Sequence, residues 1–416
     1  MTGQTGWRPL RPPNARSPAL APFTRLARTQ ALVSAGDTLV ALALSSSLFF
    51  SISPDAARSQ VALYLALTMA PFAVVAPLLG PWIDRKQGGR RSMVLLSAGA
   101  RAGVCLLMMD DVDGLLLFPE ALAVLVLGKG YSVARASLVP GLVKDPSELV
   151  EANSKLVLIL GLAGFAAALP GVALLQLGAP FVLAAAAAAF AAAAVVAFRI
   201  PPTTVAADQA GPDERAELRG AGILLAASAM AVLRGVVGFL AFHLAFFLRT
   251  DGAETWWFGV VLASSAVGSL LGAWLAPHLR RLVREERVLL ACLVVTMVAA
   301  LSMLRLGGRG SAALLALMVG VTASAGRLCF DAIVQRDAPL ANQGRSFARF
   351  ETRFQLAWVG GAFLPVLVSI PLGTGYVVVA VAALVAAVSY ATGRQLRAAH
   401  LRRLVPRRRP RGVHDQ

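Results

Sequence analysis

Five ionisable side chains stand inside long apolar stretches of the sequence: Asp37, Arg101, Glu120, Lys129 and Arg234. A charged group in the middle of a membrane costs roughly 2.5–3.5 kcal/mol even on translocon-based scales. A desolvated carboxyl group can take up a proton, and a nearby cation favours its charged form again. We therefore predict a substrate and proton pathway, in which Asp37 or Glu120 carries a proton and the cations modulate it or anchor an anionic substrate. The alternative is a set of structural ion pairs between helices.

A second group of charged residues falls nearer to one end of the apolar stretches. Arg135, Asp331, Glu351 and Arg353 are expected at similar depth on three helices, with Glu351 and Arg353 on the same one. Opposite charges at one depth can form ion pairs between helices, and such pairs must break when the helices move apart. We interpret these residues as a conformational gate, with solvated helix ends as the alternative.

Both groups must be held by helices that cross a membrane. Of the 416 residues, 57% are hydrophobic and 15% are charged, whereas soluble domains carry about 25% charged residues. Apolar stretches of about 20 residues are long enough to cross roughly 30 Å of hydrocarbon at 1.5 Å per residue. The sequence predicts an all-α membrane protein with twelve transmembrane helices, near 29–52, 60–82, 91–109, 114–138, 149–175, 179–198, 220–248, 256–278, 287–305, 311–334, 346–370 and 375–393.

The chain carries a net charge of +17, which in a soluble protein would favour nucleic-acid binding. Here most Lys and Arg fall on one side of the predicted spans, as expected for cytoplasmic loops. We therefore expect cytoplasmic N- and C-termini, a basic C-terminal tail against anionic lipid headgroups, and no nucleic-acid partner. Arg greatly outnumbers Lys in this Ala-rich chain, which is typical of a GC-rich bacterial genome. For a multi-pass protein of a bacterium we expect the plasma (inner) membrane.

The two parts of the chain resemble each other at a nearly constant offset. Gly80 and Trp82 match Gly272 and Trp274, and Pro170 matches Pro365 at the same place in its span. Two similar bundles can tilt about a site between them, which is how carriers built from repeats work. The predicted organisation is a cytoplasmic tail (1–28), a six-helix bundle (29–198), a cytoplasmic linker (199–219), a second, pseudo-symmetric six-helix bundle (220–393) and a basic cytoplasmic tail (394–416).

A glycine, an aspartate and several arginines follow the second predicted span: Gly80, Asp84, Arg85, Arg90 and Arg91. This segment resembles the motif G-x-x-x-D-R-x-G-R-R that members of the major facilitator superfamily carry between their second and third helices. The resemblance implies the major facilitator fold, and it implies that Asp84 helps to lock the two halves together on the cytoplasmic side. A basic loop that only sets topology is the alternative.

Three further segments resemble the branch of this superfamily that contains bacterial siderophore and macrolide exporters. They are residues 34–37, 135–140 and 149–153. The resemblance implies a secondary active transporter that exports a small amphipathic molecule, such as a drug-like compound, a siderophore or a metabolite, by proton antiport. The alternatives are a carrier of lysophospholipids or lipid precursors, a solute importer, and a membrane sensor or scaffold on a degenerate carrier fold.

No pattern in the sequence indicates an enzyme. It has no phosphate-binding glycine loop, no nucleophile elbow and no His/Cys cluster with metal-ligand spacing. We therefore predict no catalytic residues, no metal and no cofactor. The expected partners are a small-molecule substrate, the lipid bilayer and protons, and the expected state is a monomer.

Overall fold

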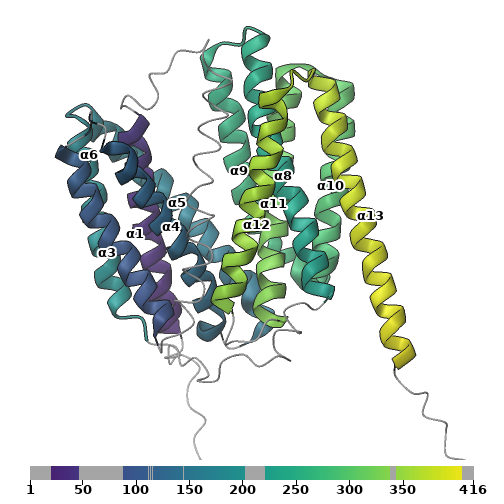
Figure 1. The fold of residues 1–416 in the computed structure, drawn as a ribbon, viewed down its shortest axis with the longest axis horizontal. Helices are drawn as coiled ribbons and strands as arrows, with labels where there is room; N and C mark the ends of the chain where they lie inside the picture. Colours follow the sequence, from purple (N-terminus) through teal and green to yellow (C-terminus); the bar gives the residue numbers. More distant parts are fainter. Residues whose placement is uncertain are drawn as a thin grey trace, which may run out of the picture.

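The computed structural model describes residues 20–45, 88–201 except 111, 113, 115 and 144, 221–337 and 343–404. This part of the chain is helical throughout (Figure 1). Two short 3-10 turns, Val139–Leu142 and Pro146–Glu148, connect the helix that ends at Leu138 to the helix that begins at Leu149. The helices are α1 (Leu20–Ser45), α3 (Gly89–Asp110), α4 (Leu117–Leu138), α5 (Leu149–Leu175), α6 (Ala179–Phe198), α8 (Ala221–Thr250), α9 (Thr255–Leu282), α10 (Glu285–Leu306), α11 (Gly308–Asp337), α12 (Gln343–Leu367) and α13 (Leu372–Leu404).

Nine of the described helices are long and apolar enough to cross a membrane: α3 to α6, α8 to α11 and α13. The predicted spans other than 60–82 coincide with described helices, whereas 60–82 and most of the linker 199–219 lie outside the described residues. The prediction of an all-helical membrane protein is therefore confirmed, and the count of twelve spans stays a prediction.

The terminal helices are longer than their apolar stretches. Helix α1 begins at Leu20, inside the region 1–28 that is predicted as a tail, and α13 continues to Leu404, inside the predicted tail 394–416. Ala, Leu and Arg are all strong helix formers, so the backbone hydrogen bonds continue after the apolar composition ends. Hydropathy therefore predicts which residues lie in the membrane but not where the helix begins or ends.

The described helices fall into an N-terminal half, α1 to α6, and a C-terminal half, α8 to α13, which stand side by side in Figure 1. Within the first half α1 packs on α5 and α6, and α3 packs on α4 and α6. Within the second half α8 packs on α12 and α13, and α10 packs on α11 and α13. These are corresponding pairs, so the described helices repeat one packing scheme, as the internal sequence matches predict.

Glycines bring α9 and α11 of the C-terminal half into backbone contact. A Cβ atom added to Gly268 or Gly272 of α9 would collide with the carbonyl oxygens of Leu317 and Val321 on α11. Small residues at four-residue spacing allow such close approach between helices in lipid. Gly268 and Gly272 therefore pack α9 closely against α11 within the chain.

The helix α3 carries a second glycine pair with the same spacing, which behaves differently. No described atom lies within 4 Å of a Cβ built on Gly99 or Gly103. The described part of the chain therefore shows no close helix contact at this second pair.

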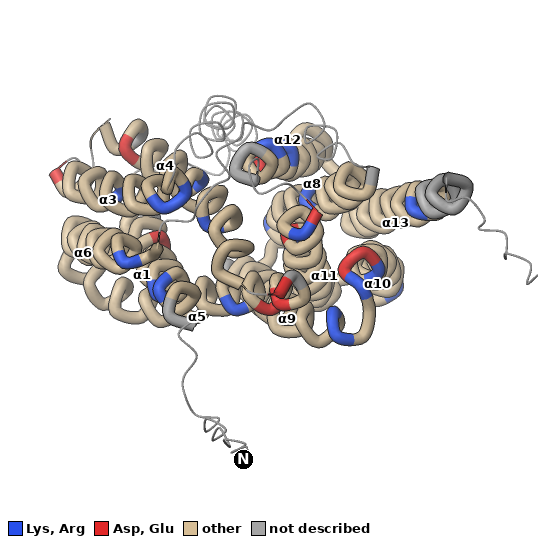
Figure 2. Tube along the Cα trace, turned by 90° about the horizontal axis from the view of Figure 1, so that it is seen from below, with Lys and Arg blue, Asp and Glu red and all other residues tan. Residues whose placement is uncertain are grey.

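Helix α1 begins and α13 ends on the same side of the molecule (Figure 1), which we call the terminus side. Viewed from this side, basic residues mark many helix ends (Figure 2). They include Arg25 at the start of α1, Arg90 and Arg91 at the start of α3, and Arg280 and Arg281 at the end of α9.

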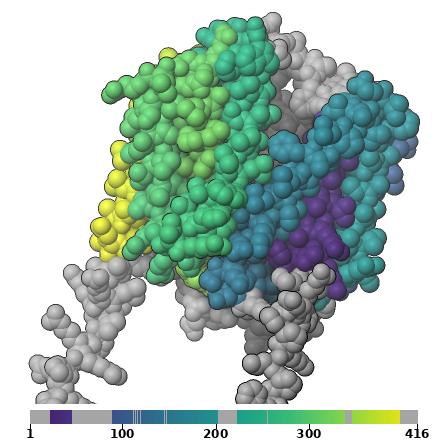
Figure 3. All heavy atoms as spheres, turned by 180° about the vertical axis from the view of Figure 1, so that it is seen from behind, coloured from purple at the N-terminus to yellow at the C-terminus, as the bar shows by residue number. Residues whose placement is uncertain are grey.

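The two halves touch through a small set of helices. Helix α5 packs against α9 and α11, and α4 packs against α12. In Figure 3 the halves meet in the lower part of the view, toward the terminus side, and diverge toward the top. The cavity described next lies along this contact.

Candidate functional site

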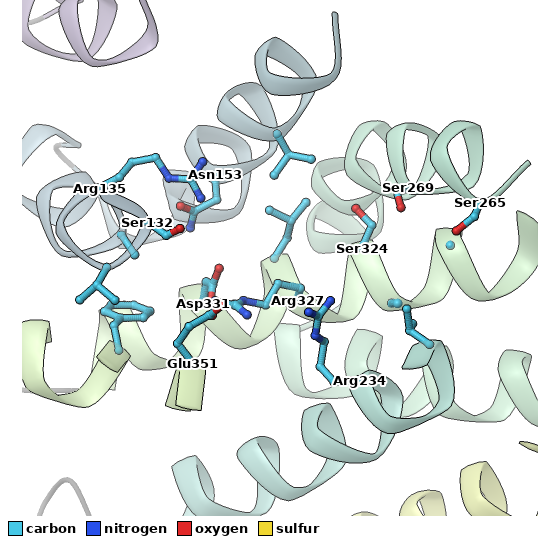
Figure 4. A pocket seen from close by; sticks show the side chains of 18 residues that line it. Ser132, Arg135, Asn153, Arg234, Ser265, Ser269, Ser324, Arg327, Asp331 and Glu351 are labelled. Carbon is cyan, nitrogen blue, oxygen red and sulfur yellow. Dashed lines mark hydrogen bonds and ion pairs between the residues drawn. The ribbon is translucent and has the colours of Figure 1, made fainter. Parts of the chain in front are cut away.

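A cavity of about 340 Å³ lies between the two halves. Its walls come from α4 and α5 on one side and from α8, α9, α11 and α12 on the other. A pocket at the joint of two bundles is the usual place for a substrate site in carriers built from repeats. The polar side chains in its lining are Ser132, Arg135, Asn153, Arg234, Ser265, Ser269, Ser324, Arg327, Asp331 and Glu351 (Figure 4).

Ion pairs link three helices at the edge of this cavity. Lys129 Nζ of α4 lies 3.3 Å from Glu351 Oε1 of α12. The guanidinium of Arg327 on α11 lies 3.1 Å from Glu351 and 2.9 Å from Asp331. Arg327 and Asp331 are four residues apart and therefore share one face of α11. Glu351 is thus held by cations from both halves of the molecule.

Two other arginines of the cavity lining form no ion pair with a described carboxylate, although Arg234 is attracted by Glu351 and Arg135 by Asp331. Arg135 Nη1 donates a hydrogen bond to Gln30 Oε1 at 3.0 Å, and the Tyr131 hydroxyl donates to the same oxygen. Within the described structure Arg234 makes no hydrogen bond and no ion pair, and its Nε atom is buried. Arg327 differs, because it pairs with two carboxylates and lies over the ring of Phe354 at 5.2 Å.

Asp37 and Arg101 form a separate ion pair inside the N-terminal half, between α1 and α3. The side chain of Arg101 is 2% exposed and that of Asp37 is 49% exposed. The Arg101 guanidinium also lies 4.1 Å from the centre of the Phe190 ring. Gly36 makes room for this ring, because a Cβ atom there would lie 2.7 Å from it.

The five residues predicted as one pathway group therefore divide into three places. Asp37 and Arg101 pair within one half, whereas Lys129 and Arg234 belong to the cavity between the halves. Glu120 lies in the first turn of α4, at the end of that helix remote from the cavity residues Ser132 and Arg135. Hydropathy gives depth in a membrane but not direction around a helix, so it could not separate these residues.

The predicted gate residues also divide. Arg135, Asp331 and Glu351 do line the cavity, whereas Arg353 is exposed on α12 and has no ion pair among the described residues. Two residues after Glu351 a helical side chain points to the opposite face, which is why Arg353 does not line the cavity. Its role in a gate stays a prediction.

Arg90 and Arg91 hold helix ends within their own half. Arg90 Nη1 donates to the Ser137 carbonyl oxygen at 3.1 Å, and Arg91 Nη2 donates to the Phe198 carbonyl oxygen at 2.5 Å. Cations favour the carbonyl ends of helices, so both contacts stabilise the terminus side of this half. Gly80, Asp84 and Arg85, which complete the motif, lie outside the described residues.

Neutral polar side chains also join the halves, and the sequence analysis did not predict these contacts. Asn153 Nδ2 of α5 donates to Gln335 Oε1 of α11 at 2.7 Å, and Gln335 Nε2 donates to the Ala136 carbonyl oxygen of α4 at 2.9 Å. The Ser154 hydroxyl of α5 donates to the Ala273 carbonyl oxygen of α9. Asn153 and Gln335 within apolar stretches could have indicated these contacts, because amide side chains in membrane helices usually hydrogen-bond to a neighbouring helix.

The structure is thus that of a helical membrane protein with a polar cavity between two similar halves. A family model described as Major Facilitator Superfamily matches residues 26–362. The chain belongs to this superfamily and is a membrane transporter, not an enzyme.

Its sequence relatives include an uncharacterized protein of Mycobacterium leprae, 30% identical over 388 residues, which cover 82% of this chain and 66% of the relative. An uncharacterized protein of Mycobacterium tuberculosis is 31% identical over 388 residues, covering 82% of this chain and 68% of that protein. The chain thus spans about two thirds of the length of these relatives.

Among solved structures, a bacterial homologue of the iron transporter ferroportin in an outward-facing state superposes with a TM-score of 0.68 at 18% identity, covering 90% of this chain and 99% of that one. The human organic anion transporter MFSD10 gives 0.70 at 15% identity, with 90% and 100% covered. The fucose:proton symporter of E. coli gives 0.66 at 13% identity, with 90% and 99% covered. At these identities the likeness concerns the fold.

Proposed function

We propose that this protein is a secondary active transporter that exports a small amphipathic molecule across the bacterial plasma membrane in exchange for protons. The observation that carries the proposal is the polar cavity between the halves, at whose edge Glu351 is bound by a cation from each half. A site with walls on both halves becomes accessible from either side in turn when the halves tilt.

The mixed lining of the cavity supports an amphipathic substrate. Arginine, serine and amide side chains face Val133, Val157, Val237, Leu328 and Phe347 across the same space. A volume of about 340 Å³ is within the range of small-molecule sites. Both walls come from one chain, which supports a functional monomer.

Coupling to protons is supported by carboxylates that hold ion pairs. Protonation of Glu351 would weaken its pairs with Lys129 and Arg327 together, and so loosen the contact between the halves. Protonation of the half-exposed Asp37 would release the buried guanidinium of Arg101. In either case a proton changes the balance between conformations, which is what antiport requires.

The proposed orientation places the terminus side, and with it both termini, in the cytoplasm. The basic helix ends on this side (Figure 2) support the proposal, because cytoplasmic loops carry an excess of Lys and Arg. The halves meet toward this side (Figure 3), so the structure corresponds in this orientation to a state closed to the cytoplasm.

The test is the accumulation of cationic, neutral and anionic amphipathic fluorophores in cells with and without the protein. At least one fluorophore should accumulate less when the protein is expressed, and collapse of the proton gradient should remove the difference. Asp37→Asn should abolish it, whereas Glu148→Gln, an exposed acid before α5, should not. If expression raises accumulation or leaves every fluorophore unchanged, export is refuted.

A further inference from the structure

Resting on the proposed transport function, we propose that the substrate is an acid, and that its oxyanion binds Arg234 in the cavity between the halves. The class is a carboxylate, sulfonate or phosphonate on an apolar body. Arg135 contributes positive charge from the opposite half.

The first step of the argument is the charge around the cavity. The lining contains Arg135, Arg234 and Arg327 but only two carboxylates, Asp331 and Glu351. Both carboxylates already have partners, because Arg327 binds both and Lys129 also binds Glu351. Positive charge is therefore in excess among the described groups that surround the cavity.

The second step is the state of Arg234. Its guanidinium points into the cavity near Arg327 (Figure 4), and its buried Nε has no hydrogen-bond acceptor among the described residues. Glu351 attracts this arginine from a distance but does not contact it, and it is already bound by Lys129 and Arg327. An arginine inside a membrane protein normally contacts an anion or a carbonyl, because a buried cation without such a contact is expensive. Its planar fork of N–H donors fits an oxyanion with two oxygens. An anionic substrate would supply the missing partner.

The third step is the neighbourhood of this arginine. Ser265 and Ser269 of α9 and Ser324 of α11 also line the cavity, so hydroxyl donors are available for the same oxyanion. Val237 and Leu328 offer apolar contact for the body of the molecule. An acid of this kind would engage both kinds of wall, whereas an amphipathic cation would meet an excess of like charge.

A thermal-shift experiment on the full-length protein in detergent tests the proposal. The probes are 4-phenylbutyrate, 4-phenylbutane sulfonate and 4-phenylbutyl phosphonate, with 4-phenylbutyramide and 4-phenylbutylamine as neutral and cationic counterparts. At least one acid should raise the melting temperature of the wild type at concentrations where the amide and the amine do not. Arg234→Gln should lower the binding affinity for that acid about tenfold or more, as expected for loss of a charged hydrogen-bond partner. Arg353→Gln, exposed on α12, should bind as wild type does.

Three results would overturn the proposal: no acid stabilises the wild type, the amide or amine stabilises it equally, or Arg234→Gln keeps full response to the acid. None of these affects the fluorophore measurement, so export can stand while the acidic substrate fails. Conversely, acid binding that depends on Arg234 in a protein that exports no fluorophore would refute export and retain the anion site.

Discussion

Lys129 and Glu351 belong to opposite halves of the molecule, and their charged atoms lie 3.3 Å apart beside the cavity. Glu351 is simultaneously bound by Arg327 of its own half. The same carboxylate therefore binds a cation in its own wall of the cavity and a cation of the opposite half. Any motion that separates α4 from α12 must break the pair with Lys129, and the pair with Arg327 can persist.

We expect Lys129→Gln and Glu351→Gln to show a coupling of about 1–2 kcal/mol in a double-mutant cycle of thermal stability. The value lies above that of a surface pair because the side chain of Glu351 is only 15% exposed, and below that of a fully buried pair because Lys129 is 34% exposed. The reference is the Lys155–Glu151 pair within α5, both exposed, for which about 0.3–0.5 kcal/mol is expected. Equal coupling in both cycles would contradict a special role for the pair between the halves.

Gln335→Ala should favour opening on the terminus side. The change removes the hydrogen bonds to Asn153 and to the Ala136 carbonyl oxygen, each of which joins the halves. With the native cysteines replaced by alanine, Val157→Cys in the cavity wall should react several-fold faster with a thiol reagent supplied from that side. The control is Gln395→Ala on the exposed face of α13, and an unchanged rate in Gln335→Ala would show that these bonds do not hold the halves together.

Neighbouring glycines of α12 should respond differently to the same substitution. Gly361→Ala would place a Cβ atom against the Gly235 carbonyl oxygen of α8, so α8 and α12 must move apart. We expect a loss of about 1–3 kcal/mol in stability, as for other overpacked contacts. Gly360→Ala, where no described atom lies within 4 Å, should be neutral or slightly stabilising. Melting temperatures of the two variants decide the matter, and equal values would mean that α8 and α12 are not in close contact.

Arg234→Met should stabilise the protein when no anion is present, by roughly 1–3 kcal/mol. Methionine keeps the apolar length of the side chain and removes a buried cation that has no ion-pair partner in the described structure. Arg353→Met, on an exposed position, should change the melting temperature little. A clear loss of stability in Arg234→Met would instead reveal an existing partner for this arginine.

Composition and pattern were sufficient for the class of the protein. An apolar stretch of about 20 residues that crosses a membrane forms a helix, because its N–H and C=O groups must then be hydrogen-bonded within the segment. The recurrence of Gly80 and Trp82 at Gly272 and Trp274 predicted related halves, and the described helices do pack in corresponding pairs. The motif around Arg90 and Arg91 indicated the family that the family model supports.

Tertiary structure alone decided which charged groups meet. Asp37, Arg101 and Lys129 look alike in the sequence, as single charges in apolar helices, yet the first two pair within one half and the third reaches Glu351 in the other. Partner choice depends on the rotation of each helix and on contacts between segments more than two hundred residues apart, such as Lys129 with Glu351. Hydropathy measures only how much charge a segment carries, whereas the direction of a side chain is set by packing against helices that are distant in the sequence.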